Sequence, residues 1–208
     1  MKGKKGFELT ATFLVTLILI IVIFVGSIYF TRRFFSTAEQ MRAEIESQTE
    51  AEIEALLYQE GALVAMPKFK KQVSRGQSDT FGLGIRNVLD QAKDFYVDVA
   101  FTTAFTIDEE VIVDTDRDHI NSKWLLYNQG PYTIQNNEIL MVPILANVDM
   151  SIGGGKSTEK GIYSFNVCVF STNVGGSKPT FNCGQPSKSQ IPELIYGGKI
   201  YKMYVEVV

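Results

Sequence analysis

The stretch KDFYVDVAFTTAFTI, residues 93–107, decides the fold class of the C-terminal part of the chain. Its first half alternates between apolar residues and a second, mixed set. One set is Phe95, Val97, Val99 and Phe101, and the other is Tyr96, Asp98 and Ala100. Because successive side chains of a strand point to opposite faces, this period of two predicts a β-strand with one face in a core. GIYSFNVCVFST, residues 161–172, repeats the pattern.

Further β-rich runs surround these two strands. They are SDTFGLGIRNVL (78–89), KWLLYNQ (123–129), NNEILMVPILANVDM (136–150) and KIYKMYVEVV (199–208). Clusters rich in Gly, Ser, Asn and Asp separate them, as is typical of turns. No long helical pattern interrupts the runs, which argues against a parallel α/β sheet. We therefore expect an antiparallel β-sandwich of about seven strands over residues 62–208, which we call the head.

The chain begins differently, with MKGKKG followed by a long apolar run. Residues 7–30 carry one charge, Glu8. As a helix they would be roughly 33 Å long, enough to cross a hydrocarbon core of about 30 Å. The run exceeds the ~7–15 apolar residues of a secretory signal, and no small-residue cleavage site follows it. We predict a basic leader at 1–6 and a transmembrane helix at 7–30.

Charge and cysteine distribution suggest the orientation. Lysines precede the apolar run, which favours a cytoplasmic N-terminus. Both cysteines lie in the head, where they could pair outside the reducing cytoplasm. The expected location is the cell membrane, with a single span and an extracytoplasmic C-terminal domain.

Residues 31–60 read as a helical stalk without Pro or Gly. An apolar stripe at helical spacing includes Phe34, Met41, Ile45 and Ile53. Two alternatives stay open for this stripe. It could pack on the chain's own head, or it could associate with the stripes of neighbouring subunits. The overall class is therefore α+β, with a long N-terminal helix followed by a sandwich.

Few residues suggest chemistry. The formal charge of −3 does not indicate a nucleic-acid partner, and one histidine makes a histidine metal site improbable. Asp114, Asp116 and Asp118 resemble the start of a calcium loop, although His119 and Leu125 stand where such a loop has Gly and Glu. The alternative is a solvated turn. No group of residues supports catalysis, and we expect neither an enzyme nor an obligatory cofactor.

Cys168 and Cys183 are the two cysteines of the chain. We expect a disulfide that ties the strand around Cys168 to the following loop. The alternative is a buried Cys168 with an unpaired Cys183.

The head resembles an immunoglobulin-like surface or adhesion domain of prokaryotic envelope proteins. The resemblance rests on VSRGQSDTFGLGIRNV (73–88), LLYNQGPYTIQNNEILMVPILANV (125–148) and KGIYSFNVCV (160–169). The Cys…Trp…Cys hallmark of immunoglobulin domains is not met, because Trp124 precedes both cysteines. The resemblance therefore implies a fold rather than a ligand.

The N-terminus resembles a type IV prepilin, with its class III signal peptide, as found in archaea and bacteria. Lys4, Lys5 and Gly6 would form the cleavage motif for a prepilin peptidase, and Phe7 would be the first mature residue. The family places Glu at the fifth mature position, where this chain has Ala11. Glu8 could instead neutralise a neighbour's terminal amine. The resemblance implies a homo-oligomer built through the N-terminal helix, as a filament or pseudopilus subunit. The alternative is an uncleaved, membrane-anchored binding or adhesion module.

Overall fold

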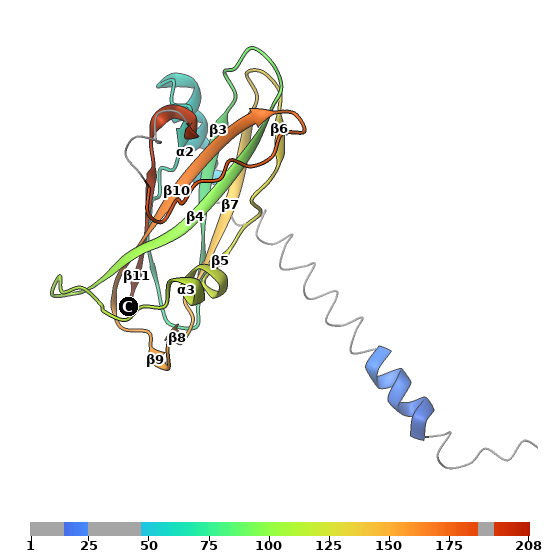
Figure 1. The fold of residues 1–208 in the computed structure, drawn as a ribbon, viewed down its shortest axis with the longest axis vertical. Helices are drawn as coiled ribbons and strands as arrows, with labels where there is room; N and C mark the ends of the chain where they lie inside the picture. The colour runs from blue at the N-terminus through green and yellow to red at the C-terminus, as the bar shows by residue number, and fades with distance from the viewer. Residues whose placement is uncertain (1–14, 25–46, 187–193) are drawn as a thin grey trace, which may run out of the picture. The chain divides into compact units, whose positions relative to one another are not determined.

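The computed structural model describes residues 15–24, 47–186 and 194–208 (Figure 1). The chain divides into two compact units, Met1–Ala43 and Glu44–Val208. In the first unit, residues 15–24 are helical. None of the helices described is both long enough and apolar enough to cross a membrane. The predicted span 7–30 extends beyond 15–24, so most of it lies outside the described residues, as do the leader and the first part of the stalk.

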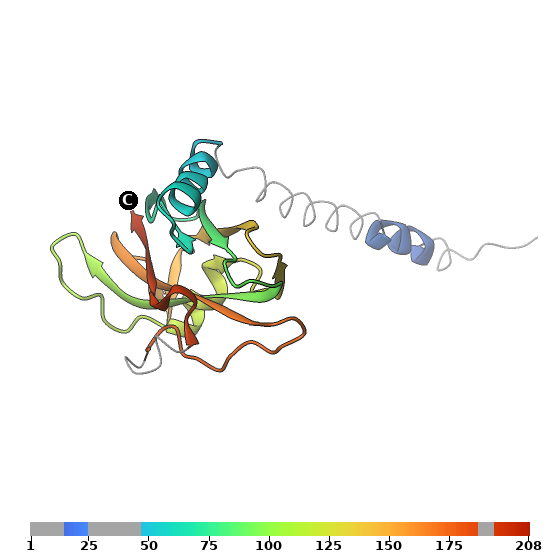
Figure 2. The same cartoon turned by 90° about the horizontal axis from the view of Figure 1, so that it is seen from above.

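Two β-sheets form the second unit, which Figure 2 shows from above. One sheet, called here the β3 sheet, has the order β1 (Val64–Ala65), β3 (Ser78–Arg86), β7 (Ile139–Asn147), β5 (Leu125–Leu126). The other, called the β10 sheet, has the order β2 (Lys70–Val73), β11 (Tyr201–Val207), β10 (Gly161–Asn173), β4 (Lys93–Thr106), β6 (Tyr132–Ile134). β8 (Ser151–Gly153) and β9 (Lys156–Ser157) form a separate hairpin. The predicted β-sandwich is confirmed, but its short strands bring the number above the predicted seven, and β2 joins its sheet in parallel rather than antiparallel.

The strand order is that of an immunoglobulin-like sandwich. β1, β3, β7 and β5 occupy the A-B-E-D positions, and β2, β11, β10 and β4 the A′-G-F-C positions. β2 pairs parallel with β11, whereas the neighbours of β10 and β7 are antiparallel. The order departs in one respect: β5 pairs with β7 before the chain returns to the β10 sheet as β6.

The core lies between the sheets and follows the predicted alternation. Phe95, Val97, Val99 and Phe101 of β4 are all buried. Trp124 packs against Tyr163 of β10, with ring centroids 4.6 Å apart. β10 differs from a half-exposed strand because its outward residues are buried as well. They join a second apolar cluster with the segment that follows the strand, consisting of Tyr96, Cys168, Phe170, Cys183 and Ile195.

Short helices complete the unit. α2 (Ser47–Glu54) continues into a π-helical turn, η1 (Ala55–Gln59), and η2 (Tyr196–Gly198) precedes β11. α3 (Arg117–Lys123) stands where the sequence predicted only a turn, because Asp116 accepts a hydrogen bond from the His119 backbone N and caps the helix. The predicted strand at 123–129 is reduced to Leu125–Leu126.

Candidate functional site

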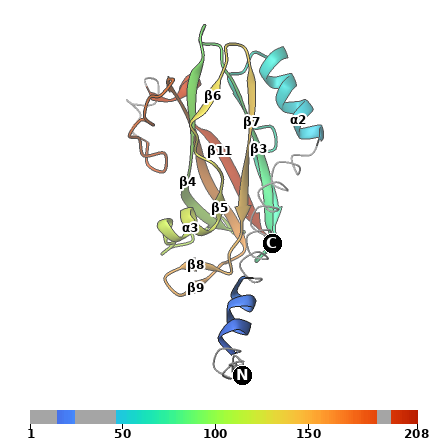
Figure 3. The same ribbon diagram turned by 90° about the vertical axis from the view of Figure 1, so that its right-hand side faces the viewer.

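The end of the stalk is docked on the outer side of the β3 sheet. α2 lies beside β3 and β7 (Figure 3). Ile53 and Leu57 are fully buried in a small cluster with Ala65. A methyl group at Gly84 of β3 would overlap Ile53 Cγ2 and lie 2.8 Å from Leu57 Cδ1. Only the absence of a side chain at Gly84 therefore lets the helix approach the sheet this closely.

Arg86, two residues further along β3, holds the last turn of the helix. Its Nη1 donates to the Leu57 carbonyl oxygen at 3.0 Å, and its guanidinium carbon lies 5.0 Å from the centroid of the Tyr58 ring. Its Nη2 donates to Asn137 Oδ1 at 3.0 Å. A hydrogen bond from a charged group and a cation–π contact thus act on the same turn, which fixes its direction on the head.

These contacts bear on the predicted association stripe. Ile53, one of the residues predicted for contact between subunits, is buried on the chain's own sheet, so it corresponds to the intramolecular alternative. Phe34, Met41 and Ile45 lie outside the described residues. Sequence reasoning missed Gly84 and Arg86. The available signal was the pair of glycines at 82 and 84, on alternate positions of one strand face.

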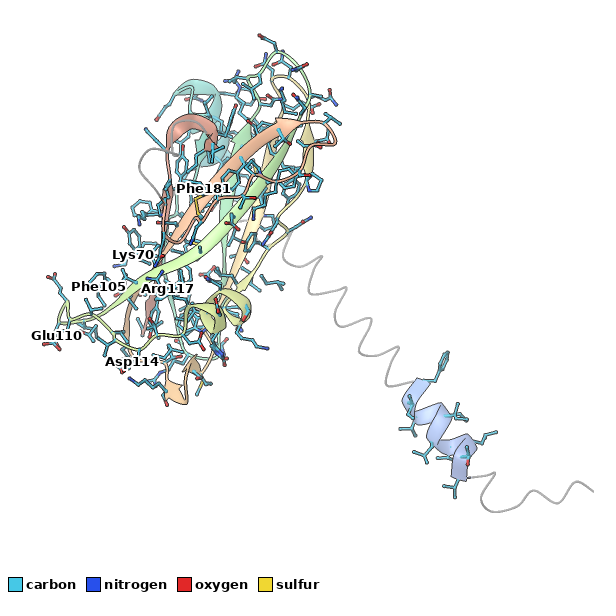
Figure 4. The ribbon with its side chains drawn as sticks, in the orientation of Figure 1. Lys70, Phe105, Glu110, Asp114, Arg117 and Phe181 are labelled. Atoms are coloured by element: carbon cyan, nitrogen blue, oxygen red, sulfur yellow. A yellow bond between two sulfur atoms is a disulfide. The ribbon has the colours of Figure 1, made fainter. Side chains whose placement is uncertain are left out.

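A disulfide joins Cys168 of β10 to Cys183 in the loop that follows the strand. The Asn166 side chain donates to the Cys183 carbonyl oxygen at 2.6 Å, and Lys178 pairs with Asp98 at 2.8 Å. The Phe181 ring, labelled in Figure 4, lies 5.7 Å from that of Phe170, centroid to centroid. The described part of the loop therefore covers the outer face of the β10 sheet around Cys168 and Phe170.

The aspartates predicted to bind calcium are engaged separately. Asp114 pairs with Lys156 at 2.7 Å, and this hydrogen bond holds the pKa of Asp114 below its ordinary value. Asp116 caps α3, and Asp118 is exposed in the first turn of that helix. Within the described residues no group of three or more His, Cys, Asp or Glu is placed to hold a metal ion. The calcium site proposed from the sequence is therefore not formed there.

The helix at 15–24 exposes its apolar side chains. Their exposed fractions run from 45% for Leu17 to 65% for Phe24. Clustered exposure of this kind marks a surface for lipid or for another protein. The predicted cleavage residues Lys4, Lys5, Gly6 and Phe7 lie outside the described residues, as does Glu8.

No protein-family model and no curated protein matches the chain. Solved structures with a similar fold include the ASH/PapD-like domain 7 of human CEP192, with a TM-score of 0.41 and 10% identity, covering 70% of this chain and 85% of that domain. The class 5 fimbriae chaperone CfaA has a TM-score of 0.33 and 9% identity, covering 68% of this chain and 54% of that one. The CooA pilin subunit from enterotoxigenic Escherichia coli has a TM-score of 0.26 and 9% identity, covering 69% and 94%. Scores this low carry no functional argument.

Proposed function

We propose that this protein is a non-enzymatic, single-pass membrane protein of the cell envelope that serves as a type IV pilin-like filament or pseudopilus subunit. Its N-terminus is cytoplasmic and its immunoglobulin-like head is extracytoplasmic. The observation that carries the proposal is the apolar helix at 15–24, which exposes nearly all of its side chains and lies inside a run with one charge between residues 7 and 30. A bilayer, or the same helix of other copies, would remove this surface from water.

The docked end of the stalk supports a role in which a helix carries a head. Ile53 and Leu57 pack α2 and η1 on the β3 sheet, so this end of the predicted stalk is held on the sandwich. The Cys168–Cys183 disulfide agrees with an exported head, because such bonds persist in oxidising compartments. A prepilin peptidase acting after Gly6 is the partner that this role requires.

A second candidate is an uncleaved, membrane-anchored binding or adhesion module. The burial of Ile53 on its own head favours it, because that residue is no longer available for contact between stalks. In this case the head acts singly and the N-terminal helix only anchors it.

The test is the mature N-terminus of the full chain, extracted from membranes after co-expression with a prepilin peptidase and measured by mass spectrometry. A chain that begins at Phe7 supports the pilin-like subunit. A Gly6→Val variant is the matched control, because it should block cleavage while the hydrophobic run stays intact. A chain that retains its leader in the presence of active peptidase refutes the subunit role and leaves the anchored module.

A further inference from the structure

We propose that residues 174–185 form a lid whose closure depends on the redox state of Cys168 and Cys183. This segment is called here the cover. With the disulfide intact, the cover seals part of the outer face of the β10 sheet; with both thiols reduced, it lifts while the sandwich stays folded. The inference concerns the head alone and goes beyond the proposed function, on which it does not depend.

The cover lies on outward-facing side chains of two adjacent strands. They occupy alternate positions of β4 and β10 and are Asp94, Tyr96, Asp98, Asn166, Cys168 and Phe170. Cys168 and Phe170 are fully buried although they point away from the core between the sheets. Ile162, on the same face at the other end of β10, is partly exposed. The cover therefore accounts for the burial of this half of the face.

Four contacts with side chains of the sheet hold the cover in place. They join Gly175 N to Asp94 Oδ2 at 2.7 Å, the Gly176 carbonyl to Tyr96 Oη at 2.6 Å, Lys178 Nζ to Asp98 Oδ1 at 2.8 Å, and the rings of Phe181 and Phe170 at 5.7 Å between centroids (Figure 4). The disulfide and the bond from Asn166 to the Cys183 carbonyl fix the end of the segment. The cover is thus held by single contacts and one covalent bond.

Strand pairing does not hold the cover. Its described backbone–backbone hydrogen bonds close its own turns, from Gly176 N to Asn173 O and from Gln185 N to Asn182 O. Beneath it, β4 and β10 pair with each other along their length. Lifting the cover therefore leaves the sheet intact. Because the ordering of an irregular segment costs conformational entropy and each contact contributes little, the covalent bond decides whether the cover stays closed.

Opening requires a dithiol as the reductant. One of its thiolates attacks a sulfur of the Cys168–Cys183 bond, the S–S bond breaks, and a mixed disulfide forms. The second thiol then displaces the chain's sulfur. The dithiol becomes a disulfide, and the chain gains two electrons and two protons as two thiols. Cys168 is 0% and Cys183 1% exposed, so the cover must lift transiently before a thiolate can reach either sulfur. The closed cover consequently protects the bond that closes it.

The first test measures hydrogen exchange of the full chain in detergent, with and without dithiothreitol. Reduction should remove the protection of the peptide covering residues 174–185, while peptides from β4 and from the β3 sheet keep theirs. Protection that persists in the cover after complete reduction overturns the inference. Protection lost throughout the head also overturns it, because the bond would then hold the whole sandwich rather than a lid.

The second test uses Cys168 as a reporter beneath the cover. In Cys183→Ser it is the one thiol of the chain, and iodoacetamide should alkylate it at least tenfold faster than a thiol in the core between the sheets. The core reporter is Val169→Cys in a chain that also carries Cys168→Ser and Cys183→Ser, since Val169 is fully buried on the inner face of β10. Equal rates would mean that Cys168 is reached only by unfolding of the head, which overturns the lid.

The ion pair supplies a matched pair of variants for the closed state. Lys178→Met should make the oxidised chain several-fold faster to reduce with dithiothreitol, because one contact that holds the cover on Asp98 is gone. Lys160→Met, at an exposed lysine outside the cover, should leave the rate unchanged. Equal rates in the two variants would contradict reduction through a lifted cover.

Discussion

Replacing Gly84 by alanine tests the docking of the stalk on the head most directly. The added methyl would overlap Ile53 Cγ2 and come within 2.8 Å of Leu57 Cδ1, while the backbone of β3 is held by β7 on one side. The helix must therefore move away from the sheet. Overpacking of this kind costs about 1–3 kcal/mol. At about 1.4 kcal/mol for each factor of ten, the opening of the helix should become roughly 5-fold to 150-fold more frequent.

Hydrogen exchange of the full chain, followed by mass spectrometry, measures how often the docked helix opens away from the sheet. The peptide covering residues 50–59 should lose protection in Gly84→Ala, whereas peptides from β10 should keep theirs. Gly184→Ala is the matched control, because its methyl would meet Ala100 Cβ at an ordinary 3.4 Å.

A double-mutant cycle identifies the clashing atoms. Ile53→Ala alone should destabilise the docking by about 2–5 kcal/mol through loss of a buried side chain. The destabilisation of the double variant Ile53→Ala/Gly84→Ala should be smaller than the sum of the two single effects by about 1 kcal/mol, because the nearer of the two clashing side chains is gone. Unchanged exchange in Gly84→Ala, or strictly additive effects in the pair, would show that the helix does not rest on Gly84.

Three other predictions concern the head. Cys183→Ala should lower the free energy of unfolding by about 3 kcal/mol in the chain-entropy model, because it removes the bond to Cys168. The loss would be measured as a lower urea midpoint and as faster proteolysis of the loop around residue 183. An unchanged midpoint would mean that the disulfide is not needed for stability. Burial raises the pKa of Tyr163 to about 12, so the folded state holds the phenol proton at a pH where the unfolded chain, with a pKa near 10, releases it. The free energy of unfolding should therefore fall as the pH rises from 10 to 12. The variant Tyr163→Phe should show a smaller fall. Asp114→Asn and the addition of EDTA should both leave the urea midpoint unchanged. A lower midpoint in EDTA would indicate a bound metal ion at Asp116 and its neighbours.

The long strands were predictable because their inward residues repeat every second position. Phe95 and Val97 of β4 behave as the alternation requires. β10 shows the limit of this reasoning: Asn166 and Cys168 read as an exposed face, yet both are buried under the loop that Cys183 attaches. A covering segment leaves no periodic trace in the strand that it covers, so only the three-dimensional structure reveals it.

The short elements could not be predicted from the sequence, for a different reason. β2 and β6 are too brief to show a period, and their pairing depends on neighbours distant in sequence. α3 carried a usable signal, since Asp116 is a good N-cap residue ahead of a short helix-compatible run. The docking site of the stalk could be predicted only in part. The apolar spacing indicated a stripe on the helix, but the contact of Ile53 with Gly84, seen in the structure, shows which surface the stripe packs on.

The parallel pairing of β2 with β11 has a mechanical consequence. Lys70–Val73 lie in register with Tyr204–Val207, and both strands run the same way. Tension applied between Phe69, just before β2, and Val208, just after β11, would pull the two strands past each other along their length. The backbone bonds of the pair would then share the load at once instead of opening one after another, so the head should resist stretching better than its short strands suggest. Force spectroscopy between these two points would measure that resistance.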